Sequence, residues 1–147
     1  MVDAGGSGAA AVWSVAVDSS EVSRWFSEYL DAFAACGRGE SDTGSLLAYY
    51  GVPLLLTTDE GFFALTSDDQ VVAVVQQQFD GMRAAGYYGS EILGSEVTVL
   101  NSTSALYRGT FSRHMSDGGE ISRLTATYLV TDGGAGCRIS VLAVHSP

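Results

Sequence analysis

The chain has 147 residues, of which 46% are hydrophobic and 16% are charged. It can therefore build one core of ordinary domain size, and most of it is too apolar to be disordered. Seventeen acidic residues against seven basic ones give a net charge of −10, and every basic residue is an arginine. Because so acidic a chain repels phosphate backbones, we expect no nucleic-acid partner, and the absence of lysine excludes Schiff-base and P-loop chemistry.

The N-terminal segment, residues 1–18, is rich in glycine and alanine. Its only charge before the apolar stretch 9–17 is Asp3, whereas a signal peptide begins with positive charge. The stretch is also too short to span a bilayer. We therefore predict a flexible tail over 1–18, with Trp13 and Val15 docking locally, and no contact with a membrane.

The rest of the chain, residues 19–147, is predicted to form a single domain. It contains both cysteines, Cys36 and Cys137, which are too few for a disulfide framework. Two small buried thiols in a reducing compartment are the simpler interpretation, and we expect a cytoplasmic protein. With only two histidines beside them, no metal site and no cofactor is expected.

Helical periodicity begins directly after this tail. The pattern predicts a helix over 20–36, capped by Ser19 or Ser20, and a short helix over 43–50 that ends before a glycine and a proline. The apolar stripe of the first helix consists of Val22, Phe26, Tyr29, Leu30 and Phe33.

Two short strands and a long helix are predicted next. The strands cover 54–58 and 62–65, and the helix covers 67–86 after a capping box formed by Ser67 and Gln70. The apolar side of this helix carries Val71, Val72, Val75, Phe79 and Met82.

From Tyr87 onward the apolar residues alternate with period two. Strands this long must curl, and Gly89, Gly94 and Gly109 are candidate bulge or bend points. The predicted fold is therefore α+β: a cone-shaped, curled six-stranded sheet, antiparallel or mixed, with three helices and the long helix in the concavity. The four long strands are predicted over 87–100, 104–116, 119–131 and 137–146.

The tight turn at 117–118 fixes the register of two long strands. It places Phe111 opposite Leu124 and Tyr107 opposite Tyr128, so that one face is apolar with two phenols. The other face then carries arginine, threonine and serine. A slip of one residue would mix the two faces, which supports this register.

The last hairpin is predicted to pair Asp132 with Cys137. This register turns His145 to the apolar face, where an imidazole would be able to exchange protons near neutral pH. The same register turns three apolar side chains inward, Ile139, Val141 and Ala143.

The first long hairpin has two possible registers. If Leu100 pairs with Ser104, Glu91 faces the concave side opposite Arg113. If the register shifts by one residue, Glu96 faces inward instead. We prefer the first register, which gathers a carboxylate, a guanidinium and an imidazole at one end of the cone; the other interpretation of these groups is an exposed rim.

This order of elements resembles the nuclear transport factor 2-like (NTF2-like) superfamily over residues 20–146. Local support comes from residues 46–50, which enter the first strand, and from the closing run 138–146. The superfamily includes ketosteroid isomerases, SnoaL-like polyketide cyclases and limonene epoxide hydrolase. The resemblance implies a cone that holds a small apolar ligand and a homodimer formed through the outer sheet face.

The catalytic residues of the isomerases match this chain only in part. Their base falls near Thr58, with Asp59 one residue later, and their second acid falls on Ala126 or Thr127. Their phenol on the first helix matches Tyr29, which faces inward. The Asp-Arg-Asp arrangement of the hydrolase has no full match.

Three functions are therefore considered. The first is a small-molecule-binding protein without assigned catalysis. The second is an isomerase, cyclase or hydrolase acting on an apolar cyclic substrate, with His145 or Asp59 as base. The third is a dimeric interaction scaffold that uses Leu106, Leu129, Leu142 and Val144 on the outer face. The predicted ligand-binding residues are Tyr29, Glu91, Tyr107, Phe111, Arg113, Tyr128 and His145.

Overall fold

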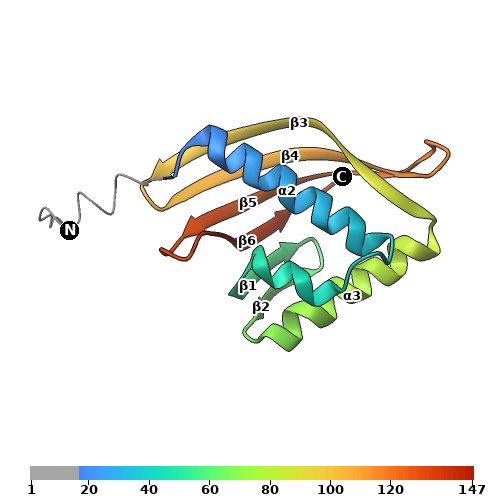
Figure 1. Cartoon of the computed structure of the whole chain (residues 1–147), viewed down its shortest axis with the longest axis horizontal. Helices are drawn as coiled ribbons and strands as arrows, with labels where there is room; N and C mark the ends of the chain where they lie inside the picture. The colour runs from blue at the N-terminus through green and yellow to red at the C-terminus, as the bar shows by residue number, and fades with distance from the viewer. Residues whose placement is uncertain (1–16) are drawn as a thin grey trace, which may run out of the picture.

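The computed structural model describes residues 17–147, which form one curled sheet with its helices on the concave side (Figure 1). The predicted tail lies outside the described residues except for its last two positions, and Trp13 and Val15 lie outside them as well. In chain order the elements are α2 (Ser19–Gly37), the 3₁₀ helix η1 (Thr43–Ala48), β1 (Tyr50–Thr58), β2 (Gly61–Leu65), α3 (Asp68–Ala84), β3 (Tyr87–Asn101), β4 (Ser104–Met115), β5 (Glu120–Asp132) and β6 (Cys137–Val144).

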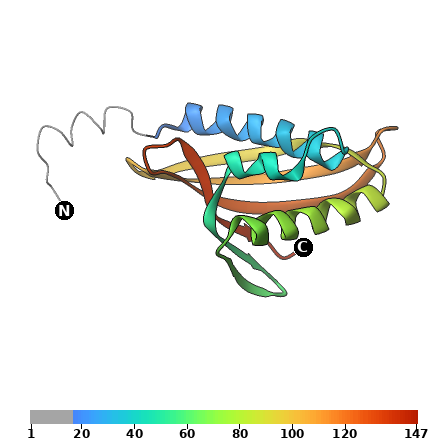
Figure 2. The ribbon, with the colours of Figure 1, turned by 60° about the horizontal axis from the view of Figure 1, so that its bottom comes forward.

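The sheet has six strands in the order β2-β1-β6-β5-β4-β3. Neighbouring strands are antiparallel except β1 and β6, which are parallel, so the predicted curled and mixed sheet is confirmed. Figure 2 shows β1 and β2 turned away from the plane of the four long strands. Helix α2 lies over β3 and β4, and α3 packs against η1, β1 and β2.

The two helix starts differ in how well the sequence predicts them. Helix α3 is capped as predicted, because the Ser67 hydroxyl accepts a hydrogen bond from the Gln70 N–H at 3.2 Å. Helix α2 is capped by Asp18 and not by a serine; its carboxylate accepts the Glu21 N–H at 2.9 Å. A carboxylate also interacts favourably with the positive end of the helix dipole.

The end of the predicted tail belongs to the folded domain. The Val17 N–H donates to the carbonyl of Ser102 at 3.1 Å, and the Val17 side chain packs against the core. Strand β1 also starts earlier than predicted, at Tyr50, because the backbone there pairs with Ile139 of β6. Pairing between segments so far apart in the chain leaves no local signal in the sequence.

The predicted register of β4 with β5 is confirmed along most of its length. Phe111 lies opposite Leu124, and Tyr107 lies opposite Tyr128. The register departs only near the turn, where a bulge follows Arg113. These strands therefore present one apolar face to the helices, as their alternating sequence predicts.

The predicted orientation of the last strand is wrong beyond its first residues. Asp132 pairs with Cys137 as expected, but Val130 pairs with Ile139 whereas Leu129 pairs with Val141. Ser140 is the extra residue of this β-bulge, and every later side chain changes face. Leu142 and Val144 therefore face the core side, and Val141, Ala143 and His145 face outward.

A bulge in β3 also changes a predicted pairing. Bulges occur next to Gly89 and Gly94, at two of the three predicted glycines. As a result Ser90, and not Glu91, lies opposite Arg113, and Glu91 lies opposite Ser112 on the outer face. Glu96 lies opposite Arg108 and also faces outward.

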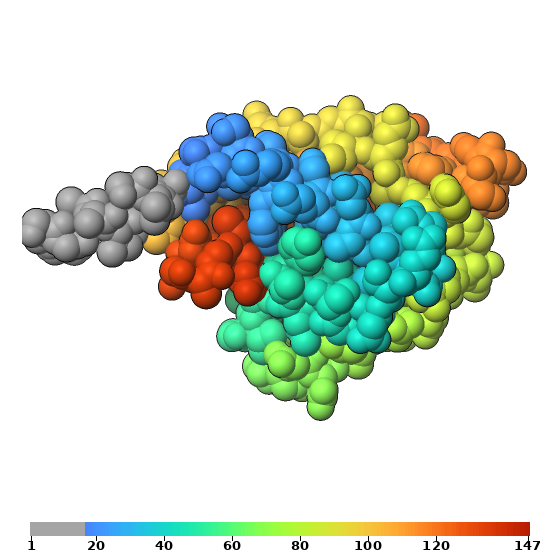
Figure 3. All heavy atoms as spheres, viewed as in Figure 1, coloured from blue at the N-terminus to red at the C-terminus, as the bar shows by residue number. Residues whose placement is uncertain are grey.

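The N-terminal half of α2 packs on the sheet without leaving space. Phe26 stacks on Tyr107 with ring centroids 3.7 Å apart. Gly109 makes this possible, because a Cβ there would lie 2.5 Å from Cζ of Phe111. In Figure 3, α2 covers this part of the sheet, and η1 lies beside α2. We call this region the packed end; its most buried members are Val22, Phe26, Ala105, Tyr107 and Val130.

Candidate ligand cavity

The C-terminal half of α2 encloses a cavity of about 40 Å³ above the sheet. A cleft of about 170 Å³ between α3 and the strands β1, β2 and β6 adjoins it, because both spaces share Tyr50, Gln78, Leu142 and Val144. We call the cavity and this cleft the hollow end. The cavity alone holds no more than a few water molecules, so a larger molecule must also occupy the cleft. Its lining consists of Tyr29, Leu30, Phe33, Tyr50, Gln78, Ser90, Phe111, Arg113, Leu124, Ala126, Tyr128, Leu142 and Val144.

Two buried phenols of the lining are hydrogen-bonded to each other. The hydroxyls of Tyr29 on α2 and Tyr50 on β1 lie 2.6 Å apart. Burial raises the pKa of Tyr29 well above its usual range and raises the pKa of Tyr50 to about 12, so both are protonated at neutral pH. Since one hydrogen suffices for the bond between them, the other remains to be donated elsewhere.

A third phenol, Tyr128 of β5, has no such partner. Tyr128 is 7% exposed, and its hydroxyl, which keeps some contact with solvent, forms no hydrogen bond with the described residues. Burial raises the pKa of Tyr128 as well, so its hydroxyl keeps its proton. The cavity lining therefore includes a hydrogen-bond donor that has no acceptor among the described residues.

Arg113 of β4 provides the positive charge of the cavity. It is half-buried, and its guanidinium carbon lies 5.7 Å from the centroid of the Phe33 ring. Its charge acts on Tyr29, Tyr50 and Tyr128 and lowers the pKa of each, although burial outweighs this effect. No aspartate, glutamate or histidine is among the lining residues within the described chain.

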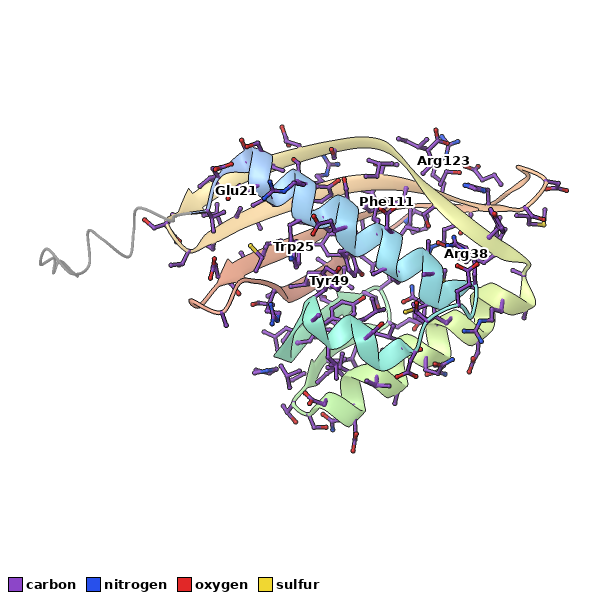
Figure 4. The ribbon with its side chains drawn as sticks, viewed as in Figure 1. Glu21, Trp25, Arg38, Tyr49, Phe111 and Arg123 are labelled. Atoms are coloured by element: carbon purple, nitrogen blue, oxygen red, sulfur yellow. The ribbon has the colours of Figure 1, made fainter. Side chains whose placement is uncertain are left out.

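Four of the predicted ligand-binding residues lie together in this lining: Tyr29, Phe111, Arg113 and Tyr128. Figure 4 shows Phe111 on the sheet face that α2 covers. Tyr107 does not reach the cavity, because it is stacked on Phe26 in the packed end.

Glu91 and His145 lie on the outer face, so their predicted inward orientation is wrong. Nε2 of His145 is hydrogen-bonded to the Thr127 hydroxyl at 2.7 Å. The reserve base, Asp59, lies in the turn between β1 and β2 and accepts a hydrogen bond from Ser146 at 2.6 Å. The two bases considered for an isomerase, cyclase or hydrolase are therefore away from the cavity.

Sequence reasoning missed three polar members of the lining. Tyr50 was predicted to end a short helix, but it begins β1. Gln78 lies at the edge of the apolar stripe of α3, and this position was the one available signal that it borders the interior. Ser90 enters the lining only because a bulge shifts β3.

Within residues 17–147, no group of three or more histidine, cysteine or carboxylate side chains is arranged to hold a metal ion. Over the same residues, no helix has both the length and the apolar character needed to cross a bilayer. Cys36 and Cys137 are free thiols.

Comparison with known proteins supports this architecture. The family described as NTF2-like protein (DUF6841) matches residues 20–147. A comparison with curated proteins gave no match. A protein of unknown function with a cystatin-like fold from Nostoc punctiforme is 23% identical with a TM-score of 0.63, over 87% of this chain and 76% of that chain.

Two further solved structures have the same fold. An NTF2-like protein with a cystatin-like fold from Novosphingobium aromaticivorans is 17% identical with a TM-score of 0.63, over 85% of this chain and 79% of that chain. The yeast UBP3-associated protein BRE5 is 12% identical with a TM-score of 0.62, over 83% and 90% of the two chains. At these identities the likeness shows the fold alone.

Proposed function

The chain belongs to the DUF6841 family of NTF2-like proteins, and from this premise we propose that it binds a small, mostly apolar molecule in the hollow end of its cone. The observation that carries the proposal is Tyr128, a residue of the lining that is 7% exposed and whose hydroxyl has no hydrogen-bond partner among the described residues. A ligand with an acceptor atom would add a hydrogen bond there, worth about 0.5–1.5 kcal/mol.

The remaining walls favour an apolar ligand body. In the cavity they are formed by Phe33, Phe111 and Leu124, and in the cleft by Leu54, Leu65 and Val75, together with Leu142 and Val144, which are common to both. A concave apolar site with a few polar groups directed into it is the usual form of a small-molecule site.

The proposal is tested by filling the cavity. Ala126 is fully buried in its lining, so Ala126→Leu places a larger side chain in the space. Ala73→Leu on α3 is the matched control, because Ala73 is exposed and lines neither the cavity nor the cleft. Binding is measured in a fluorescence or calorimetric screen of uncharged and anionic apolar probes. We expect wild type and Ala73→Leu to bind and Ala126→Leu to bind at least tenfold more weakly, a loss of about 1.4 kcal/mol. Equal binding by all three proteins, or no binding by wild type, would refute the proposal.

We also propose a homodimer through the outer face of the long strands. Apolar side chains gather there on adjacent strands, namely Leu106, Leu129, Val141 and Ala143, and the helices in Figure 1 lie on the opposite face. Of the residues predicted for this face, Leu142 and Val144 face the core side and are replaced by their neighbours. Light scattering is expected to give twice the mass of one chain for wild type and the mass of one chain for Leu129→Arg. A monomeric wild type at micromolar concentration would contradict the dimer.

A cytoplasmic location is proposed as well. Its support is that Cys36 and Cys137 are free thiols, as reducing compartments maintain them. Cell fractionation of the native host tests it, and recovery of the protein outside the cytoplasmic fraction would overturn it.

A further inference from the structure

We propose that the hollow end selects a carboxylate: its ligand is a monocarboxylic acid with an apolar aliphatic or aromatic body, bound through Arg113, Tyr128 and the hydroxyl pair of Tyr29 and Tyr50. This inference rests on the proposed function and specifies the ligand of the same site. It is carried by two observations on residues 17–147: Arg113 has no counter-charge among them, and the cavity has more hydrogen-bond donors than acceptors.

Arg113 differs from the other half-buried arginines of the described chain. Arg38 forms an ion pair with Glu40 at 2.9 Å and donates to the Tyr88 carbonyl. Arg138 donates to the Cys137 carbonyl at 2.8 Å. Arg113 has neither an ion pair nor a hydrogen bond within residues 17–147, although it lines the cavity and its guanidinium lies over the ring of Phe33, another lining residue. A partly desolvated cation is stabilised by an anion, and a guanidinium matches a carboxylate with two parallel hydrogen bonds.

The phenol hydroxyls that line the cavity together with Arg113 can also donate hydrogen bonds to a ligand. Tyr128 has a free hydrogen, and the pair of Tyr29 and Tyr50 has one more to offer. Burial raises the pKa of all three phenols, so none becomes an anion that would neutralise Arg113 itself. An acceptor-only group such as a carboxylate satisfies these donors, whereas an amine or ammonium group would compete with them.

The charge of the whole chain restricts the anion further. The net charge is −10, and the cavity provides one guanidinium, so a multiply charged phosphate would meet repulsion without a second cation. A single carboxylate is neutralised by Arg113 alone. The apolar body then extends into the cleft, where Leu54, Leu65 and Val75 line the wall.

The test compares octanoate with octanamide by isothermal titration calorimetry. The two molecules share their chain length and differ in charge. Three proteins are titrated: wild type, Arg113→Gln and Arg108→Gln. Arg108 is the matched control, because it lies on the same strand, is exposed and faces outward opposite Thr127. Tyr128→Phe is a fourth protein, which keeps the ring volume and removes a hydroxyl that has no hydrogen-bond partner among the described residues.

We expect wild type and Arg108→Gln to bind octanoate about ten- to a hundredfold more tightly than octanamide, and Arg113→Gln to lose this preference. Tyr128→Phe is expected to weaken octanoate binding about tenfold at an unchanged melting temperature. Equal affinities of wild type for both probes would overturn the carboxylate inference and leave the proposed function standing. Absence of binding by both probes would overturn both, and a preference that survives in Arg113→Gln would overturn the role of Arg113.

Discussion

The two halves of α2 lie over the same sheet and use the same spacing of large apolar residues, but only one half closes the space beneath it. At the packed end Phe26 meets Tyr107 at stacking distance, and Gly109 leaves room for the rings. At the hollow end the hydroxyl of Tyr29 is hydrogen-bonded to that of Tyr50, and the small Ala126 lies in the cavity lining. A helical stripe therefore shows which residues face inward and does not show whether they fill the interior or line a cavity.

The largest contrast between the two ends is expected in stability. Phe26→Ala removes a fully buried ring from the packed end and should lower the free energy of unfolding by about 3–5 kcal/mol. Leu124→Ala removes a half-buried side chain at the hollow end and should cost about 1–2 kcal/mol. Denaturant unfolding monitored by circular dichroism measures both values, and equal losses would break the distinction between the ends.

Alkaline pH should lower the stability of the fold through the buried phenols of the hollow end. Burial raises the pKa of Tyr50 to about 12 in the folded state, while a tyrosine in the unfolded chain titrates near 10. The folded state therefore holds this proton to higher pH, so stability is unaffected below pH of about 10 and falls as pH rises toward 12, by about 3 kcal/mol for this group. Unfolding curves across this range should show the loss, and Tyr50→Phe should reduce it. The same alkaline loss in the variant would show that other groups cause it.

Adding a methyl group at the packed end should lower the free energy of unfolding by less than removing the Phe26 ring does. A Cβ at Gly109 would lie 2.5 Å from the Phe111 ring and 3.0 Å from the Tyr107 ring, so Gly109→Ala forces both rings to move. We expect a loss of about 1–3 kcal/mol in the free energy of unfolding. Ala126→Gly at the hollow end is the comparison, where removing a methyl group only enlarges an existing cavity. A thermal melt in which Gly109→Ala equals wild type would mean that the Phe111 and Tyr107 rings have room to move.

The smallest effect is expected from the phenol pair. Tyr29→Phe removes one partner of a buried hydrogen bond and should cost about 1 kcal/mol. Tyr50→Phe should cost a similar amount, and the double variant should cost clearly less than both single changes added together, since one bond is lost in each case. Strict additivity in this double-mutant cycle would mean that the two hydroxyls do not stabilise each other.

The sequence predicts the fold well where the signal is local. The turn at 117–118 and the separation of polar from apolar residues define the register of β4 with β5, and Ser67 with Gln70 marks the start of α3. The bulge at Ser140 leaves no such signal, because residues 141–144 are all apolar and fit either face of the sheet. That one residue moves His145 from the cavity to the outer face.

The candidate site, too, is predictable only where its residues are placed by local sequence signals. Tyr29, Arg113 and Tyr128 can be placed from helical spacing and strand register. Tyr50 cannot, because its position depends on parallel pairing between β1 and β6, which only the folded chain reveals. The volume left between the side chains is likewise a property of their packing and is not encoded in any short motif.

The central claim is that the hollow end binds a ligand. A heteronuclear NMR titration of the full chain with octanoate tests this directly, because each residue reports its own environment. We predict saturable shifts at Tyr29, Arg113 and Tyr128, with Ala105 and Tyr107 at the packed end unchanged. Shifts confined to the outer sheet face, or no saturable shifts at any concentration below that of octanoate micelles, would contradict it.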